Sequence, residues 1–190
     1  MAADRALSDE ELFERFRAFR DERAFAELVH RHEDRLFALA TRMLSNRHDA
    51  LDAVQDAFIF AYRRAGSFRG DSSFGTWLYR IAINSCTDVL RRRARSPQPV
   101  EQSAETSGRA PAPVEATVER VDLERALEAL QREFREAVIL HDLLGVPHKE
   151  IAAALGIPVG TVKSRISRGR LRLAEMMEPG RRRAPSKEQR

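Results

Sequence analysis

The stretch "HKEIAAALGIPVGTVKSRISRGRLRL", residues 148–173, decides the fold of the C-terminal half of the chain. Its first part predicts a short helix over about 148–155, whose alanines let a second helix cross closely. Gly156 can adopt the left-handed conformation of a tight turn, and Pro158 stands where a second helix begins. A short helix, a glycine turn and a second helix in this order are typical of a helix-turn-helix.

The second of these helices is expected to have two faces. At about 100° per residue, Val162, Ile166 and Leu173 fall within one narrow sector, which predicts a buried stripe. The opposite sector is expected to carry the polar and basic side chains Thr161, Ser164, Arg165, Arg168 and Arg172. Leu171 lies off the apolar stripe.

The polar sector has the composition of a DNA recognition helix, which places the side chains of its N-terminal part against base edges in the major groove. Small side chains permit close approach, while Lys and Arg reach guanine or phosphate. The pattern predicts DNA contacts for Thr161, Lys163, Ser164, Arg165 and Arg168. A charged, solvated face is the alternative. The glycine turn, the alanine-rich first helix and the local charge favour DNA.

The net charge of +4 is unevenly distributed along the 190 residues. Residues 159–190 carry ten Lys or Arg and three Asp or Glu, a balance of +7, whereas residues 97–158 carry a balance of −5. Such segregation favours a polyanionic partner for the C-terminal end.

The remaining sequence is also helical in pattern, without convincing alternation of apolar and polar residues, so the fold class is predicted to be all-α. Ser8 and Glu11 have the spacing of a capping box for a first short helix. Further helices are predicted over about 22–45, 48–65, 73–94 and 119–130, with an apolar continuation to 144. The helix over 48–65 is expected to bury Leu51, Val54, Phe58 and Tyr62.

A segment rich in Pro, Ser, Ala and Gly separates the two helical parts and predicts a flexible linker. The chain is therefore expected to contain two small helical domains. The predicted division is an N-terminal segment 1–21, a first domain 22–95, a linker 96–118, a second domain 119–177 and a basic tail 178–190.

Composition and motifs also exclude several classes of protein. No apolar run approaches the roughly 20 residues that cross a bilayer, and the charged N-terminus argues against a secretory signal, so we expect a cytoplasmic protein without direct membrane insertion. The single cysteine, Cys86, is expected to be a small buried residue. We find no catalytic constellation and no glycine-rich phosphate loop, and expect no enzymatic activity, cofactor or small-molecule substrate.

An acidic helix face in the first domain has three possible explanations. Asp49, Asp52 and Asp56 recur at i, i+3 and i+7, with Gln55 beside them. They could hold a divalent metal, dock a basic partner or simply be solvated. A metal site needs further ligands from facing helices, and no second acidic cluster of similar spacing is present. His30 and His32 are two residues apart and point to different faces of their helix.

The next helix combines aromatic, basic and amide side chains beside the polar loop "SFRGDSS", residues 67–73. This composition could hold unstacked bases. By their spacing, Phe74 and Trp77 are expected to belong to the core. The loop, Arg80 and Asn84 are then the better nucleic-acid candidates.

Four stretches together resemble the extracytoplasmic-function (ECF) class of bacterial RNA polymerase sigma factors. They are "FAELVHRHEDRLFALATRML", "DALDAVQDAFIFAYR", "FRGDSSFGTWLYRIAINSCTDVLRRR" and "FREAVILHDLLGVPHKEIAAALGIPVGTVKSRISRGRLRL". The resemblance covers about residues 22–95 and 119–175 and is specific, because two motif sets occur in the family's order. Ser167 stands where relatives can carry a bulkier group, so no base preference is transferred.

The resemblance implies a role for each surface. Asp49, Asp52, Gln55 and Asp56 would dock on the β′ coiled coil of core RNA polymerase, and the first half of the second domain on the β flap. The minus-ten element would be bound by Ser67, Phe68, Arg69, Gly70, Asp71, Arg80, Asn84 and Asp88. The minus-thirty-five element would be read by Thr161, Lys163, Ser164, Arg165, Ser167 and Arg168. The family also implies an anti-sigma factor as a partner.

Two other functions compete with this hypothesis. A free-standing helix-turn-helix regulator would bind duplex DNA alone, but it would leave the first domain unexplained. A helical metal-dependent enzyme would use the face of Asp49, Asp52 and Asp56, and would show metal binding that is lost on Asp52→Ala.

Overall fold

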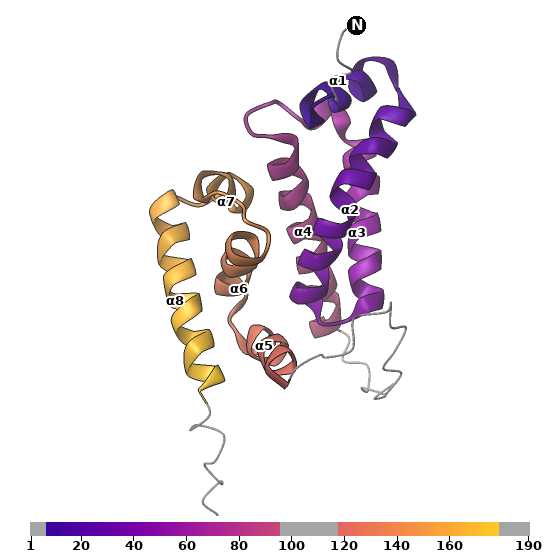
Figure 1. Cartoon of the computed structure of the whole chain (residues 1–190). Helices are drawn as coiled ribbons and strands as arrows, with labels where there is room; N and C mark the ends of the chain where they lie inside the picture. The colour runs from indigo at the N-terminus through magenta and orange to yellow at the C-terminus, as the bar shows by residue number, and fades with distance from the viewer. Residues whose placement is uncertain (1–6, 96–117, 179–190) are drawn as a thin grey trace, which may run out of the picture.

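The computed structural model describes residues 7–95 and 118–178, and every regular element in these two ranges is helical (Figure 1). This confirms the predicted all-α class. The predicted linker and basic tail lie almost wholly outside the described residues. The long helices of the N-terminal part are α1 (Asp9–Phe19), α2 (Glu22–Leu44), α3 (Arg47–Arg63) and α4 (Phe74–Arg95). Those of the C-terminal part are α5 (Val118–Ala129), α6 (Arg132–Val138), α7 (His148–Leu155) and α8 (Val159–Met177).

The first domain is a bundle of α2, α3 and α4, with α1 across one end (Figure 1). Polar caps begin its helices. Ser8 and Glu11 form the predicted capping box of α1, with backbone-to-side-chain distances of 2.7 and 3.2 Å. Asp21 and Asn46 cap α2 and α3 by accepting backbone N–H groups. These caps satisfy donors that the first turn of a helix leaves free.

The buried face of α3 differs from the predicted one. Alanines at i, i+3, i+7 and i+11 turn inward and are fully buried, whereas Leu51 is 46% exposed. The prediction that Leu51 is buried was therefore wrong; Val54, Phe58 and Tyr62 are half-buried. Helix α3 contacts both α2 and α4, and small side chains let the three backbones approach closely. The inward residues are Ala50, Ala53, Ala57 and Ala61.

The second domain contains the predicted helix-turn-helix. Helix α7 ends at Gly156, whose φ of 66° places it in the left-handed region, and α8 follows after Pro158. Helix α6 continues into a π-helical turn, Ile139–Leu143. A close crossing joins α6 and α8 at Gly169, where an added Cβ would lie 2.6 Å from Val138 Cγ2.

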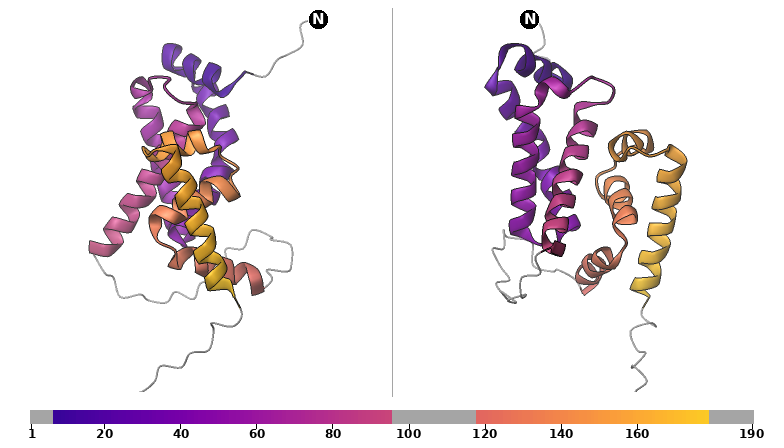
Figure 2. Two further views of the ribbon diagram at one scale, coloured as in Figure 1. Left: turned by 90° about the vertical axis from the view of Figure 1, so that its left-hand side faces the viewer. Right: turned by 180° about the vertical axis from the view of Figure 1, so that it is seen from behind.

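The two domains pack against each other, which the sequence did not predict. Helix α7 contacts α4 and helix α5 contacts α2, and Figure 2 shows the C-terminal helices lying beside the first bundle. One apolar cluster spans both domains. Polar contacts cross the boundary: Thr76 Oγ1 donates to Glu150 Oε2 at 2.9 Å, and the guanidinium of Arg135 donates to the carbonyl of Met43 at 3.0 Å.

Candidate nucleic-acid interface

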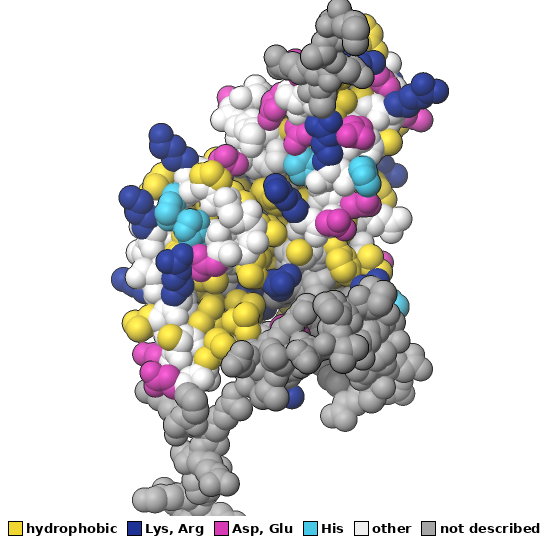
Figure 3. Space-filling view, viewed as in Figure 1, with side chains coloured by type: hydrophobic (Ala, Val, Ile, Leu, Met, Phe, Trp, Pro, Cys, Tyr) yellow, Lys and Arg dark blue, Asp and Glu magenta, His cyan; other side chains and the backbone are white. Residues whose placement is uncertain are grey.

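The outer face of α8 is small, polar and basic. Lys163, Ser164, Ser167 and Arg168 are exposed, and Thr161 is half-buried. Val162, Ile166 and Leu173 are buried on the inner side, as predicted. Figure 3 shows Lys and Arg side chains along the edge of the molecule formed by α7 and α8. This face can approach a duplex closely, because its central side chains are serines.

Two arginines of α8 do not lie where the sequence analysis placed them. Arg165 donates to Glu133 at 3.0 Å, and Arg172 donates to Gln131 at 2.8 Å while its guanidinium lies 4.5 Å from the centre of the Phe134 ring. Three residues correspond to about 300°, so Arg165 lies only about 60° from Val162 and flanks the buried stripe. The prediction that both arginines face away from the stripe was wrong.

The basic side chains of α8 therefore fall into two groups, those that form a hydrogen bond or ion pair with other residues of the domain and those that form none with any described residue. Arg170 pairs with Asp142, and hydrogen bonding from this guanidinium lowers the pKa of the Asp142 carboxyl. Within the described ranges, no hydrogen bond or ion pair engages the side chains of Lys163 and Arg168. Arg168 projects from the outer face, and Lys163 is exposed at its edge, so both can meet phosphate or base edges without first breaking a contact.

Leu171 also lies on the outer face of α8 and is 62% exposed. Its position nine residues after Val162 puts it about 180° from the buried stripe. The helical spacing thus contained the signal, and the exposed leucine adds an apolar contact to an otherwise polar surface.

The loop between α3 and α4 exposes polar groups over an aromatic base. Arg69, Gly70 and Asp71 are exposed, and Gly70 has a φ of 78°. The hydroxyl of Ser67 donates to the carbonyl of Arg64 at 2.7 Å. The ring of Phe68 is instead buried, and its centre lies 5.3 Å from that of Phe13. Phe68 thus supports the loop from below.

Helix α4 continues this surface. Arg80, Asn84 and Asp88 are exposed and recur every four residues, so they lie along one side of the helix. Asp88 accepts a hydrogen bond from Arg91 at 3.3 Å. Phe74 is fully buried, and Trp77 is half-buried with its ring 5.4 Å from that of Phe13. The expectation that these two rings belong to the core is confirmed.

The acidic face of α3 is more mixed than the sequence indicated. Asp52, Gln55 and Asp56 are exposed, whereas Asp49 forms an ion pair with Arg93 at the basic end of α4. Large apolar side chains stand exposed on the same helix: Leu51, Ile59 and Phe60. Their exposure was not predicted from the sequence, although the alanine spacing at 50, 53, 57 and 61 could have revealed which face turns inward.

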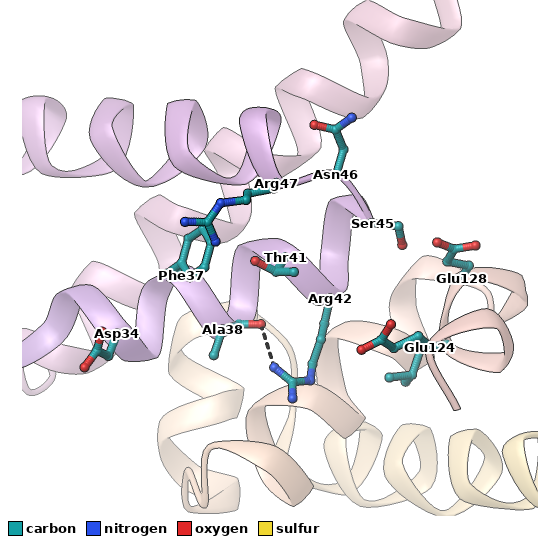
Figure 4. Close-up of a pocket in the computed structure, with 11 residues that line it drawn as sticks. Asp34, Phe37, Ala38, Thr41, Arg42, Ser45, Asn46, Arg47, Glu124 and Glu128 are labelled. Carbon is teal, nitrogen blue, oxygen red and sulfur yellow. Dashed lines mark hydrogen bonds between the residues drawn. The ribbon is translucent and has the colours of Figure 1, made fainter. Parts of the chain in front are cut away.

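A groove of about 370 Å³ lies between α2 and α5 (Figure 4). Arg47 stacks over the Phe37 ring at 5.2 Å from its centre, and Arg42 donates to the carbonyl of Ala38 at 3.2 Å. Glu124 and Glu128 lie on the α5 side. The groove brings together charges of both signs.

Other reactive groups are sparse in the described parts of the chain. No group of three His, Cys, Asp or Glu residues there could hold a metal ion. Cys86 is fully buried as expected, and this burial raises the pKa of its thiol to about 12. His32 is buried and His30 exposed, so the pair does face different sides. No described helix has the length and apolarity to cross a membrane.

Comparison with known proteins matches both domains. Residues 28–96 match the family model Sigma-70 region 2, and residues 120–173 match Sigma-70, region 4. The ECF RNA polymerase sigma-E factor of Escherichia coli is 39% identical over 185 residues, which are 91% of this chain and 96% of that protein. The ECF sigma factor SigE of Mycolicibacterium smegmatis is 40% identical over 159 residues, which cover 80% of this chain and 60% of that longer protein.

A solved structure is similar across both domains. It is the co-crystal structure of the sigma factor RpoE with the anti-sigma factor NepR from Bartonella quintana. The match has a TM-score of 0.67 and 32% identity, and it covers 83% of this chain and 98% of that one.

Proposed function

The chain belongs to the ECF sigma factors of RNA polymerase, and on that premise we propose how its two domains divide promoter recognition. Sigma factors are transcription initiation factors, and this chain directs core polymerase to the promoters of a specific set of genes. The observation that carries the proposed DNA contacts is the exposed surface of α8, a helix of the helix-turn-helix. There the side chains of Lys163 and Arg168 form no hydrogen bond or ion pair with any residue that the structure describes.

The second domain reads the minus-thirty-five element with the outer face of α8. Lys163 and Arg168 contact guanine or phosphate, while Ser164 and Ser167 allow the backbone to approach the groove. Arg165 and Thr161 lie at the edge of this face. Arg165 reaches the DNA backbone only after exchanging its contact with Glu133. We therefore rank Arg168 above Arg165 as a determinant of specificity.

The first domain holds the single-stranded minus-ten element. The exposed groups of the loop, Arg69 to Asp71, meet an unpaired base, and Arg80, Asn84 and Asp88 follow the strand along α4. Ser67 and Phe68 contribute through the loop backbone, because the ring of Phe68 is buried.

Helix α3 docks on the β′ coiled coil of core polymerase. Asp52, Gln55 and Asp56 supply charge and hydrogen bonds, and the exposed Leu51 and Phe60 supply apolar area. Exposed apolar residues next to charged ones are typical of a protein–protein interface. Asp49 joins this contact only if it leaves Arg93.

The first half of the second domain docks on the β flap of core polymerase.

The packed domains have to separate on a promoter. Helix α8 reaches α4 through α7, so with helices about 10 Å wide the two DNA-binding faces lie on the order of 20–30 Å apart. Elements near positions −35 and −10 are about 25 base pairs apart, or ~85 Å along a duplex. The chain from Arg95 to Val118 can span up to ~75 Å if fully extended. Separation of the two domains can therefore bring their DNA-binding faces to the spacing of the two promoter elements.

An anti-sigma factor is the proposed partner of the packed arrangement. The similar RpoE structure contains one, and its match covers more of this chain than either domain alone. Binding across both domains would keep the two DNA-binding faces too close for one promoter. The other proposed partners are core polymerase and promoter DNA. Because both are cytoplasmic in bacteria, we expect the chain to act in the cytoplasm. The catalytic chemistry belongs to the polymerase.

The test combines the purified chain with bacterial core polymerase and a promoter library, followed by sequencing of the run-off transcripts. We expect initiation downstream of one shared pair of spaced elements. Transcription no higher than with core polymerase alone, together with unaided binding to duplex DNA, would favour a free-standing regulator instead.

A further inference from the structure

Helix α1 touches the beginning and the end of the loop Ser67–Ser73. It lies outside both segments that match sigma-factor regions, because the first of them begins at residue 28. Figure 1 shows it at the end of the first domain, beside the chain that leads into α4. Its contacts with this loop are polar at both ends and aromatic in the middle.

One polar contact holds the start of the loop. The guanidinium of Arg17, near the end of α1, donates to the carbonyl oxygen of Phe68 at 3.0 Å. Arg17 also pairs with Glu14 one turn earlier at 3.0 Å, which orients the guanidinium. A charged donor on a backbone carbonyl fixes the path of the chain just before the exposed Arg69 to Asp71.

A second polar contact holds the end of the loop. Glu10, in the first turn of α1, accepts the backbone N–H of Phe74 at 3.2 Å, while Ser73 accepts that of Thr76 at 3.2 Å. Phe74 is the first residue of α4, so the carboxylate of Glu10 also faces the positive end of that helix. Its neighbour Asp9 is bound to His32 of α2 at 2.6 Å. The first turn of α1 therefore has a fixed position relative to the bundle.

Between these two contacts, Phe13 forms the floor of the loop. Its ring centre lies 5.3 Å from that of Phe68, 4.7 Å from that of Phe74 and 5.4 Å from that of Trp77. The aromatic floor and the polar contacts together hold the loop at both ends, on either side of the exposed Arg69 to Asp71.

We propose that α1 positions the loop Ser67–Ser73 for capture of the minus-ten strand, with Arg17 and Glu10 as positioning residues. This inference rests on the proposed role of the loop in binding single-stranded DNA. Neither side chain needs to touch DNA, because each acts through the backbone at one end of the loop. A loop held in the binding conformation loses less entropy when it captures a base, and binding is correspondingly tighter.

The test measures how holoenzyme containing the full chain binds a single-stranded minus-ten oligonucleotide, selected by the transcription experiment above. We expect Arg17→Ala to weaken this binding about fivefold, corresponding to one lost hydrogen bond. Arg17→Lys, which keeps a charged donor, should recover part of the loss. Glu10→Ala should weaken the same binding through the other end of the loop.

Arg15→Ala is the matched control. Arg15 lies on the same helix, is exposed and pairs with Asp21 at 2.9 Å, away from the loop. It should leave oligonucleotide binding unchanged. Affinity for core polymerase, binding of a minus-thirty-five duplex and the melting temperature should be equal in Arg15→Ala and Arg17→Ala, because a merely structural defect would alter them.

The loop variants Arg69→Ala and Asp71→Ala distinguish the two claims, that the loop binds single-stranded DNA and that α1 positions the loop. If they weaken oligonucleotide binding and Arg17→Ala behaves like Arg15→Ala, the positioning role of α1 is overturned and the role of the loop stands. If the loop variants also leave binding unchanged, the proposed function of the loop fails, and the inference fails with it. Weaker binding in Arg17→Ala without an effect of the loop variants would also overturn it, because α1 would then act by another route.

Discussion

Helices α3 and α8 each bury one face and expose the other, but α8 buries its large apolar side chains whereas α3 buries its small ones. Helix α8 buries Val162, Ile166 and Leu173 and exposes mainly small polar and basic side chains. Helix α3 buries alanines and exposes Leu51 and Phe60, which are 46% and 48% accessible. The closeness of neighbouring helices decides which face is buried, because α3 contacts both α2 and α4.

The exposed faces accordingly suit different partners. Exposed leucine and phenylalanine beside carboxylates suit a contact with another protein, which removes their apolar surface from water. Serines beside a lysine and an arginine that no other described residue engages suit the grooves and phosphates of a duplex. The comparison predicts that equivalent substitutions on the two helices affect different partners, and the variants below test this from the largest effect to the smallest.

The largest effect is expected from Ala57→Leu in the buried stripe of α3. Ala57 is fully buried, so added methylenes have to displace neighbouring helices and should lower the free energy of unfolding by about 3 kcal/mol. Urea denaturation measures this change. Leu51→Ala, which removes a larger apolar side chain from the exposed face, should change it by less than about 0.5 kcal/mol. Equal losses in the two variants would show that the alanine stripe is not the tightly packed face.

The sequence predicted α8 well for a physical reason. Its stripe of Val, Ile and Leu packs against one side of a small domain, so the largest apolar side chains of this stripe are also the buried ones. The same reasoning failed for Leu51, because it assigned the larger apolar side chains to the core, whereas the close neighbours of α3 leave room only for its alanines. It also misplaced Arg165 and Arg172, whose angles to the stripe, about 60–80°, put them within reach of α6 and the turn before it.

The packing between domains was not predictable from local pattern. Thr76 and Glu150 are 74 residues apart, and nothing in the spacing of either residue reports a partner on the other domain. The capping box of Ser8 and Glu11 was predictable because the two residues lie within one helical turn. Local geometry follows from short-range spacing, whereas contacts between domains depend on shapes that form only after folding.

The next largest effect is expected from Arg168→Ala on the outer face of α8. It should weaken promoter use through the minus-thirty-five element by about 1–3 kcal/mol if Arg168 makes a bidentate base contact. Transcription from promoters with and without this element measures the effect. Arg170→Ala is the control, because Arg170 is already engaged by Asp142 and should contribute less. If Arg168→Ala kept the full advantage of the promoter that contains the element, the assignment would be contradicted.

The same substitution on both helices sharpens the comparison further. Leu51→Ala should weaken the affinity for core polymerase about tenfold, or about 1.4 kcal/mol, because an exposed apolar anchor is lost. Leu171→Ala on α8 removes an even more exposed leucine and should leave that affinity unchanged. Fluorescence titration with core polymerase measures both. A larger loss for Leu171→Ala would mean that α8, rather than α3, carries the apolar docking surface.

The smallest effect concerns Glu136, a carboxylate on the buried side of α6. Its side chain faces Arg132 at 3.1 Å, with Arg165, Arg135 and Glu133 as the other nearby charges. Burial raises the pKa of Glu136 above its ordinary value of 4.5, and the three arginines offset this only in part. The folded chain therefore binds a proton more readily than the unfolded chain, so the contribution of this group to stability is present below about pH 4.5 and is lost as the pH rises through the folded pKa.

Glu136→Gln should consequently raise the free energy of unfolding at pH 7 by less than about 1 kcal/mol, with the gain shrinking toward pH 4.5. Asp142→Asn is the opposite case, because Arg170 lowers the pKa of Asp142 and stabilises its charged form. This variant should be less stable than the parent at pH 7, and the difference should disappear in acid. Urea denaturation at several pH values measures both curves. If Glu136→Gln were destabilising at pH 7, the ion pair with Arg132 would outweigh desolvation. The burial of Glu136 would then depend on its ion pair and not only on the closeness of neighbouring helices. The explanation given for α3, that close neighbours decide which face is buried, would hold only for apolar side chains.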